Sequence, residues 1–115
     1  MSDVQTFPRS ARLTSPHDFK HVFKSANKLN FKGFTVYVLR NGQTKSRLGL
    51  AISKKSAKKA VSRNLIKRII RDSFRLRREE LPGWDIVFVS RIAAAQMTRL
   101  ELSTSISKVW KRLES

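Results

Sequence analysis

The sequence contains no cysteine and no long hydrophobic run. Without cysteine there is no disulfide framework, no thiolate metal site and no thiol nucleophile. No stretch approaches the roughly 20 apolar residues that a membrane-spanning helix needs. The opening residues, Met1 to Gln5, lack the basic segment followed by an apolar segment that marks a secretory signal. We therefore expect a cytoplasmic protein with no membrane partner.

Acidic residues are also scarce. Eight Asp and Glu stand against 25 Lys and Arg, which gives a formal net charge of +17 and a pI near 11.5. So many like charges repel one another in a compact chain, and a polyanionic partner would relieve that repulsion. A role in solubility alone is the bland alternative. An anionic membrane surface would call for apolar residues beyond those that a core uses, and the apolar positions here all fit a core.

The chain has the size and composition of one globular domain. Its 115 residues are 40% hydrophobic and 29% charged, which is typical of a folded rather than a disordered chain. No repeat, low-complexity run or linker divides the sequence. Residues 1–115 are therefore predicted to form a single domain.

Helical spacing appears near both ends of the chain. Ser15 can cap a helix, and Phe19, Val22 and Phe23 follow at i, i+3 and i+4, which predicts a short helix with an aromatic face. Towards the C-terminus, Thr98 and Glu101 fit a capping box, which marks the start of a helix. Apolar residues then recur at helical spacing and predict an amphipathic helix; they are Leu102, Ile106, Val109, Trp110 and Leu113.

Three segments have strand character. Residues 34–39 are β-branched and aromatic, and Asn41-Gly42 then predicts a turn. Residues 47–53 return as a second strand, so we expect these two segments to pair antiparallel. Residues 84–90 contain a continuous apolar run, which is typical of a strand buried on both faces. The resulting order, α-β-β-α-β-α, predicts an α+β domain.

The strand at 47–53 is expected to have two unlike faces. Because successive side chains alternate, Leu48 and Leu50 point to the core while Gly49, Ala51 and Ser53 point away from it. The small side chains leave room for a bound group. Tyr37, Phe19 and Phe23 could border that space as a platform on which unpaired bases stack, although Phe19 and Phe23 are by default core residues.

The most informative element is a basic helix between Ala60 and Glu80. Residues 54–78 carry eleven Lys or Arg and a single acid, Asp72. At about 100° per residue, the cations form one stripe, with Arg68 at its border, and the apolar residues take the opposite sector. The stripe contains Arg63, Lys67, Arg71, Arg75 and Arg78, with Asn64 inside it and Lys54, Lys55, Lys58 and Lys59 before it; the apolar sector contains Leu65, Ile66, Ile69, Ile70 and Leu76.

The charge pattern of this helix favours a nucleic acid, and RNA over DNA. An ordinary solvated helix face interleaves acids at i+4 with its cations, and this one does not. A helix-turn-helix reader of DNA would need a short helix just before the recognition helix, where a strand is predicted. A wide basic face without a base-reading device suits structured RNA, which is recognised by shape and backbone.

A catalytic or metal site on the polypeptide is not indicated. His17 and His21 lie at i and i+4, but no third ligand accompanies them, so surface histidines are the simpler interpretation. The acids occur singly apart from Glu79-Glu80, which suits a solvated helix end. No carboxylate pair of the kind that metal-dependent nucleases use is apparent, and no base accompanies the serines and threonines.

Several motifs together resemble the protein subunit of bacterial ribonuclease P. They are Phe7-Pro8-Arg9, Arg47-Leu48-Gly49-Leu50, Ser53-Lys54-Lys55, the run from Arg63-Asn64 to Ser73-Phe74, and Asp85-Ile86-Val87-Phe88-Val89. The resemblance extends from about Phe7 to Leu113. It departs from the family's Arg-Asn-Arg signature at one position, where Leu65 replaces the second arginine, so any contact that the family makes there is expected to be weaker.

The resemblance implies a fold and a function. The fold would be a two-layer α/β sandwich of about four strands and three helices, with a short extra strand near residues 29–31. The basic helix would lie in a left-handed βαβ crossover, against the general preference for right-handed ones. The chain would be a ribonuclease P subunit without catalytic residues or a protein metal site. Its partner RNA, with Mg²⁺ bound mainly by that RNA, would remove the 5′ leader from precursor tRNA, and no obligate protein partner is expected.

The charge pattern and the resemblance together assign two sets of residues. The catalytic RNA would be bound by Lys54, Lys55, Lys58, Lys59, Arg63, Asn64, Lys67, Arg68, Arg71 and Arg75. The single-stranded leader would lie in a cleft lined by Phe19, Phe23, Tyr37, Ala51 and Ser53. The alternative function is a structural RNA-binding protein of the ribosomal type, to which a leader would be irrelevant.

Overall fold

A computed structural model describes residues 12, 13 and 15–114, and within them it contains three α-helices and a four-stranded sheet. In chain order these are α1 (Pro16–Ser25), β1 (Asn27–Phe31), β2 (Phe34–Arg40), β3 (Arg47–Ala51), α2 (Ala60–Arg77), β4 (Trp84–Ser90) and α3 (Arg99–Glu114), with 3₁₀ turns η3 (Arg78–Glu80) after α2 and η4 (Ile92–Gln96) after β4. The α+β class is therefore confirmed, and β1 is the short extra strand that the resemblance implied.

The strand order is β1-β2-β4-β3, and the predicted antiparallel pairing of residues 34–39 with 47–53 is wrong. β2 pairs antiparallel with β1 and with β4, whereas β3 pairs parallel with β4 at the edge of the sheet. The reason lies in β4. Its continuous apolar run is buried on both faces of the sheet, so it takes a central place between the two segments that were expected to pair.

The loop between β2 and β3 is organised by Asn41 rather than by a two-residue turn. The Asn41 side chain accepts from the backbone N–H of Gln43 at 2.8 Å and donates to the carbonyl of Lys45 at 3.1 Å. These bonds build a wider loop over residues 41–46, which carries the chain past the position of β4.

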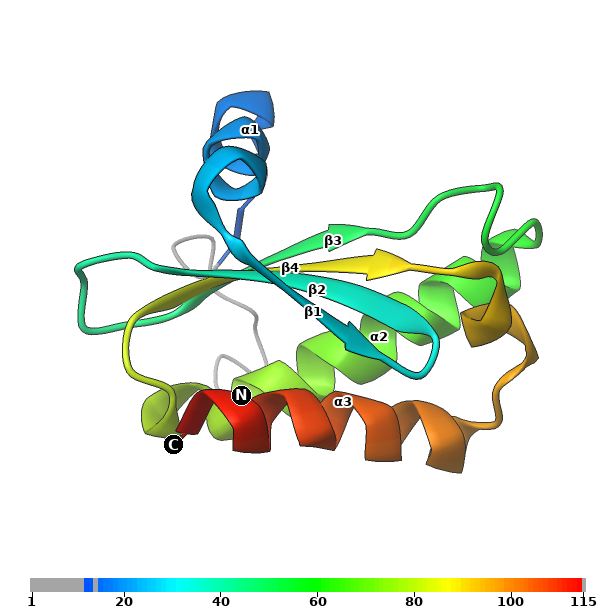
Figure 1. Cartoon of the computed structure of the whole chain (residues 1–115). Coiled ribbons are helices and arrows are strands. Elements are labelled where there is room, and N and C mark those ends of the chain that lie inside the picture. Colours follow the sequence, from blue (N-terminus) through cyan, green and yellow to red (C-terminus); the bar gives the residue numbers. More distant parts are fainter. Residues whose placement is uncertain (1–11, 14, 115) are drawn as a thin grey trace, which may run out of the picture.

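The sheet separates α1 from the other two helices (Figure 1). α2 and α3 cover one face and enclose the main core, to which Phe34, Phe88 and Trp110 contribute. α1 stands on the opposite face over β2 and β4. The expected two-layer sandwich is therefore confirmed for the sheet with α2 and α3, and α1 adds to it. β3, α2 and β4 form the expected parallel crossover unit, and its left hand stays a prediction.

Local signals in the sequence set several element ends. Ser15 caps α1, because its Oγ accepts from the N–H of Asp18 at 3.1 Å. Thr98 and Glu101 form the predicted capping box, with reciprocal bonds of 2.9 and 3.1 Å. Among the described residues, no helix is both long and apolar enough to span a membrane.

Candidate nucleic-acid interface

α2 buries one narrow face and exposes the rest. Ile66, Ile70 and Phe74 point into the core at spacings of four residues. Leu76, expected on the apolar side, is 68% exposed, so that expectation is wrong. Phe74 fills the core instead, because it continues the i+4 series that Ile66 and Ile70 begin. Arg68 therefore projects from the side of the helix opposite the core.

Among the described residues, the cations of residues 54–75 form no ion pair with a carboxylate. In the described part of the chain, the ion pairs join Lys32 to Glu101, Arg47 to Asp85, and Arg77 to Glu80 and Glu114, and none involves this segment. Of the ten side chains in this segment that are predicted to bind RNA, seven are exposed and three are half-buried. Exposed are Lys54, Lys55, Lys58, Lys59, Asn64, Arg68 and Arg71; half-buried are Arg63, Lys67 and Arg75. Like charges thus gather on one surface, where Asp72 is the segment's single acid.

Some basic side chains near the ends of α2 have structural partners that sequence reasoning missed. Arg63 donates from Nη1 to the carbonyls of Ala57 and Lys58, at 2.9 and 3.0 Å, and so braces the loop before the helix. At the other end, Nε of Arg78 donates to the carbonyl of Ser46 at 3.0 Å. The part of the predicted stripe that these bonds leave untouched lies between Asn64 and Arg75.

The N-terminus of α2 adds to the positive surface. Its N-cap is Lys59, which makes no side-chain capping bond, and the first turn contains no acid. A hollow beside it is lined by Lys55, Ser56, Lys58, Lys59, Ser62, Ile92, Ala95 and Gln96. Because the backbone N–H groups and dipole of a helix N-terminus also favour anions, this end of the predicted RNA surface suits phosphate.

The aromatic residues of the predicted leader cleft lie together on the α1 face of the sheet. The rings of Phe23 and Tyr37 meet edge to face, with centroids 4.8 Å apart and planes at 86°. The ring centroids of Phe19 and Phe23 lie 6.2 Å apart. Phe23 is 43% exposed, while Phe19 and Tyr37 are half-buried. Phe23 is therefore the ring that a partner could reach most readily.

The space beside the small side chains of β3 is partly filled. A Cβ atom built on Gly49 would lie 3.0 Å from Cε1 of Phe19, so this glycine lets the ring pack against the strand. Ala51, on the same face, is half-buried. Ser53 is exposed, but its Oγ accepts from the N–H of Ser56 at 3.2 Å and so helps to shape the following turn.

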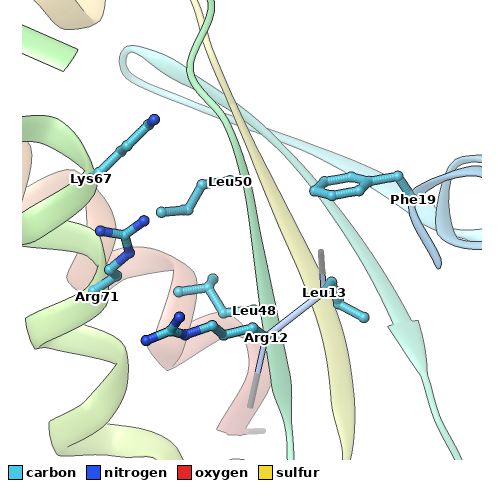
Figure 2. Close-up of a pocket in the computed structure, with 7 residues that line it drawn as sticks. All are labelled: Arg12, Leu13, Phe19, Leu48, Leu50, Lys67 and Arg71. Atoms are coloured by element: carbon cyan, nitrogen blue, oxygen red, sulfur yellow. The ribbon is translucent and has the colours of Figure 1, made fainter. Parts of the chain in front are cut away.

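The basic surface and the aromatic face meet at the edge strand β3. One pocket is lined by Arg12, Leu13, Phe19, Leu48, Leu50, Lys67 and Arg71. Figure 2 shows Lys67 and Arg71 reaching from α2 on one side of the strand and Phe19 on the other. The two predicted sets of residues thus border one continuous surface.

Sequence reasoning did not single out Arg12 and Leu13 as part of this surface. Leu13 donates its N–H to the carbonyl of Leu48 at 2.8 Å, and Arg12 forms a parallel bridge with Leu48. Phe7-Pro8-Arg9, part of the resemblance, lies outside the described residues. The available signal was an apolar residue next to a cation, shortly before the helix cap at Ser15.

A buried ion pair also escaped sequence reasoning. Arg47 donates to both carboxylate oxygens of Asp85, from Nε at 2.9 Å and from Nη2 at 2.6 Å. The Asp85 side chain is only 3% exposed. Hydrogen bonding to Asp85 raises the pKa of the Arg47 guanidinium above its ordinary value. An acid at the start of a buried strand was the available signal, because such a charge requires a partner.

The described residues include no group of three or more His, Cys, Asp or Glu that could hold a metal ion. His17 and His21 are both exposed on α1.

Residues 7–114 match the family model described as ribonuclease P. The curated ribonuclease P protein component of Thioalkalivibrio sulfidiphilus is 44% identical over 115 residues, which cover 100% of this chain and 96% of that protein. The corresponding protein of Pseudomonas putida GB-1 is 46% identical over 110 residues, which cover 95% of this chain and 82% of that one.

Solved structures agree with the sequence relatives. A Staphylococcus aureus ribonuclease P protein structure aligns with a TM-score of 0.81 at 33% identity and covers 89% of this chain and 94% of its own. A Thermotoga maritima ribonuclease P protein in complex with 1-(4-fluorophenyl)-2-thiourea aligns at 0.80 and 31% identity, over 90% of this chain and 100% of its own. With a family model matched over residues 7–114 and curated relatives 44% and 46% identical over almost the whole chain, the chain belongs to the ribonuclease P protein family.

Proposed function

We propose that this ribonuclease P subunit holds two RNAs on one continuous surface. The catalytic RNA lies on the basic face of α2 and on the lysine-rich loop before it, which contains Lys54, Lys55, Lys58 and Lys59. The single-stranded 5′ leader of precursor tRNA lies on the α1 face of the sheet. The observation that carries this proposal is the pocket at β3, where Lys67 and Arg71 border the same space as Phe19.

The basic face supplies affinity rather than chemistry. Each Lys or Arg that neutralises a phosphate releases condensed counterions, which gives strong and salt-dependent binding. The residues proposed to contact the catalytic RNA are Lys54, Lys55, Lys58, Lys59, Arg63, Asn64, Lys67, Arg68, Arg71 and Arg75. The protein's positive charge, placed beside RNA phosphates, reduces the electrostatic repulsion between neighbouring RNA segments. Without the protein, this repulsion would have to be screened by magnesium ions.

The catalyst in this proposal is the partner RNA, with Mg²⁺ held mainly by RNA phosphates. Among the described residues, the most deeply buried carboxylate, that of Asp85, is bound by Arg47 and by Asn41. The metal ligands are therefore assigned to the RNA. The protein's role in this proposal is to bind the catalytic RNA and to orient the leader of the precursor tRNA. We place this work in the cytoplasm.

The aromatic face suits a leader of variable sequence. Every base has a π-face, so stacking on Phe23 and Tyr37 stabilises an unpaired strand without selecting one sequence. Ala51 and Ser53 continue the same side of β3 towards the lysine-rich loop, and their small size lets a backbone approach. The leader thus runs from aromatic rings towards cations, as single-strand binding surfaces generally do.

The test is leader-dependent assistance to the ribozyme. Cleavage of precursor tRNA by the partner RNA is measured with and without the protein while the magnesium concentration is lowered. We expect the protein to raise the rate most at low magnesium, and the complex to bind leader-bearing tRNA more tightly than mature tRNA. An unchanged rate at every salt concentration would refute the proposal. Equal affinity for both tRNAs would favour a structural RNA-binding role, and cleavage without the RNA would make the polypeptide itself a nuclease.

A further inference from the structure

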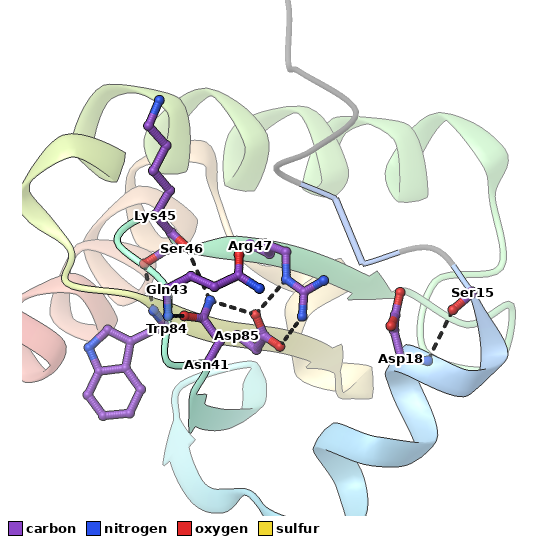
Figure 3. Close-up of polar contacts among 9 residues, drawn as sticks. All are labelled: Ser15, Asp18, Asn41, Gln43, Lys45, Ser46, Arg47, Trp84 and Asp85. Carbon is purple, nitrogen blue, oxygen red and sulfur yellow. Dashed lines mark hydrogen bonds and ion pairs between the residues drawn. The ribbon is translucent and has the colours of Figure 1, made fainter.

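Buried polar groups join the parallel strands β3 and β4 at both ends of the pair. At the start of the strands, Arg47 and Asn41 both donate to the carboxylate of Asp85 (Figure 3). At the other end, the hydroxyls of Ser56 and Ser90 are hydrogen-bonded to each other. None of the first three residues is proposed to bind RNA, whereas Ser56 belongs to the lysine-rich loop itself. The second group is therefore the one that can act on RNA binding.

The lysine-rich loop begins with a tight turn that has two lysines at its tip. The N–H of Ala57 donates to the carbonyl of Ser53 at 3.1 Å, and the N–H of Ser56 donates to Oγ of Ser53 at 3.2 Å. Between these residues, Lys54 and Lys55 are both exposed. Ser56 and Ala57, in contrast, are only 6% and 1% exposed. The turn thus presents two cations on a buried base.

The hydroxyl of Ser56 uses its full hydrogen-bonding capacity. It donates its single hydrogen to the carbonyl of Ser53 at 3.0 Å. A serine oxygen can accept two further bonds, and the hydroxyls of Ser53, at 3.2 Å, and of Ser90 take these places. Because the hydrogen of Ser56 is already used, Ser90 is the donor to Ser56. Ser90, the last residue of β4, is itself buried, so water has little access to this bond.

The two halves of the lysine-rich loop are held by different residues. Arg63 donates to the carbonyl of Lys58 at 3.0 Å and so braces the second half. Ser90 reaches the first half through Ser56. Lys55 and Ser56 also line the hollow beside the N-terminus of α2. A displaced turn would therefore move exposed cations and a wall of that hollow together.

We propose that Ser90 is a positioning residue, which fixes the turn of Lys54 and Lys55 for the catalytic RNA through its bond to Ser56. This inference rests on the proposed function, because those lysines are assigned to the catalytic RNA there. Ser90 contacts no RNA in this proposal. It acts by preorganisation, since a segment that is already ordered loses less conformational freedom when it binds than a loose one does.

Two substitutions of similar shape separate the hydroxyl of Ser90 from its packing. Ser90→Thr keeps the hydroxyl and Ser90→Val replaces it with a methyl group, while both add the same bulk. We expect Ser90→Val to bind the catalytic RNA, without tRNA, roughly three- to tenfold more weakly than Ser90→Thr, as for the loss of one buried hydrogen bond. Equal affinities would overturn the proposal. Ser90→Ala, which adds no bulk, should lose a similar factor relative to the wild type and serves if the larger residues prevent folding.

Ser105→Ala is the matched control for a general loss of stability. Ser105 is also buried and donates one hydrogen bond, to the carbonyl of Lys32 at 2.7 Å, on elements outside the lysine-rich loop. This variant should lower the free energy of unfolding about as much as Ser90→Ala does and should leave the affinity for the catalytic RNA unchanged. If both variants weaken RNA binding equally, Ser90 has no positioning role.

A double-mutant comparison tests whether Ser90 acts through the turn. Lys55→Ala should cost less than half as much RNA affinity, on a logarithmic scale, in the Ser90→Ala protein as in the wild type, because coupled residues are not additive. Arg68→Ala, on α2 outside the turn, should cost the same in both backgrounds. An equal cost of Lys55→Ala in both would contradict the link between Ser90 and the turn.

Amide hydrogen exchange without RNA distinguishes failure of this inference from failure of the proposed function. In Ser90→Ala, exchange at the amides of Ser56 and Ala57 should accelerate relative to β2. Unchanged exchange at these amides would show that Ser90 does not hold the turn. If Lys55→Ala leaves the RNA affinity of the wild type intact, the proposed lysine contact fails, and the positioning role fails with it even where exchange shows that Ser90 holds the turn.

Discussion

Phe19 packs directly against Gly49: a Cβ atom at residue 49 would lie 3.0 Å from Cε1 of the ring and 3.1 Å from Cβ of Leu13. The absence of a side chain on β3 is therefore what lets α1 approach the sheet. A valine at this position would have to displace the ring or the N-terminal segment.

Gly49→Val should consequently destabilise the fold and disturb the aromatic face. We expect a loss of about 1–3 kcal/mol in the free energy of unfolding, as for other overpacked sites, measured by urea denaturation. Phe19→Leu in the same background should recover part of the loss by removing the ring. A Gly49→Val protein as stable as the wild type would show that α1 adjusts freely.

Phe23→Ala should weaken leader binding with little effect on stability. Stacking of one base on an aromatic ring contributes about 1–3 kcal/mol, so affinity for leader-bearing tRNA should fall by roughly tenfold. Because Phe23 is 43% exposed, the free energy of unfolding should change by less than about 1 kcal/mol. Leu76→Ala, at another exposed apolar side chain, is the control for both measurements. If Phe23→Ala leaves leader affinity intact, the leader does not stack on this ring.

Arg68→Ala should lower the salt dependence of binding to the catalytic RNA. Loss of one phosphate contact reduces the slope of log affinity against log salt by roughly one unit, whatever the RNA sequence. Filter binding at several salt concentrations gives the slope. Lys111→Ala, an exposed cation on α3, should leave it unchanged. An unaltered slope for Arg68→Ala would mean that this side chain is merely solvated.

Glu101 should contribute a pH-dependent part of the stability. A hydrogen bond from Lys32, and then one from the backbone of Thr98, lower the pKa of Glu101 from 4.5 to about 2. A carboxyl with a lowered folded pKa stabilises the fold above its unfolded pKa and loses that contribution as pH falls through the folded one. The wild type should thus unfold at a higher temperature than Glu101→Gln, and this difference should be largest at neutral pH.

That difference should shrink as the pH is lowered from about 4.5 to about 2. Circular dichroism melts across this range provide the measurement. Glu79→Gln serves as the comparison, since it removes a carboxylate away from the Lys32 contact. A Glu101→Gln difference that stays constant down to pH 2 would contradict the assignment.

The sequence was most informative where structure depends on neighbours along the chain. Ser15 and the pair Thr98 and Glu101 predicted two helix starts, because capping bonds span three residues. The excess of cations on α2 was visible for the same reason, since the presence of a single acid, Asp72, among so many cations can be recognised directly in the sequence. The continuous apolar run of β4 also predicted correctly that it is buried.

Features that depend on distant partners were not predictable in this way. The Asn41-Gly42 pair suggested a hairpin, but β4 competes better for β2 and leaves β3 at the edge. The angular position of Leu76 could not reveal that Phe74 would fill the core. Arg63 looks like its neighbours in sequence, yet its guanidinium is used by the carbonyls of Ala57 and Lys58. The contact of Arg47 with Asp85 joins residues from separate strands.

The central place of β4 has a consequence for how the chain folds during synthesis. Until residues 84–90 leave the ribosome, the hairpin of β1 and β2 and the strand β3 have no common neighbour. α2 is synthesised before β4, so its apolar side has no complete sheet to pack against while its cations are already exposed. Sheet closure therefore joins the first and last thirds of the chain in one late, long-range step, which slows folding relative to a local hairpin. A nascent chain that stops before Trp84 carries the cations of α2 without the sheet that orients them.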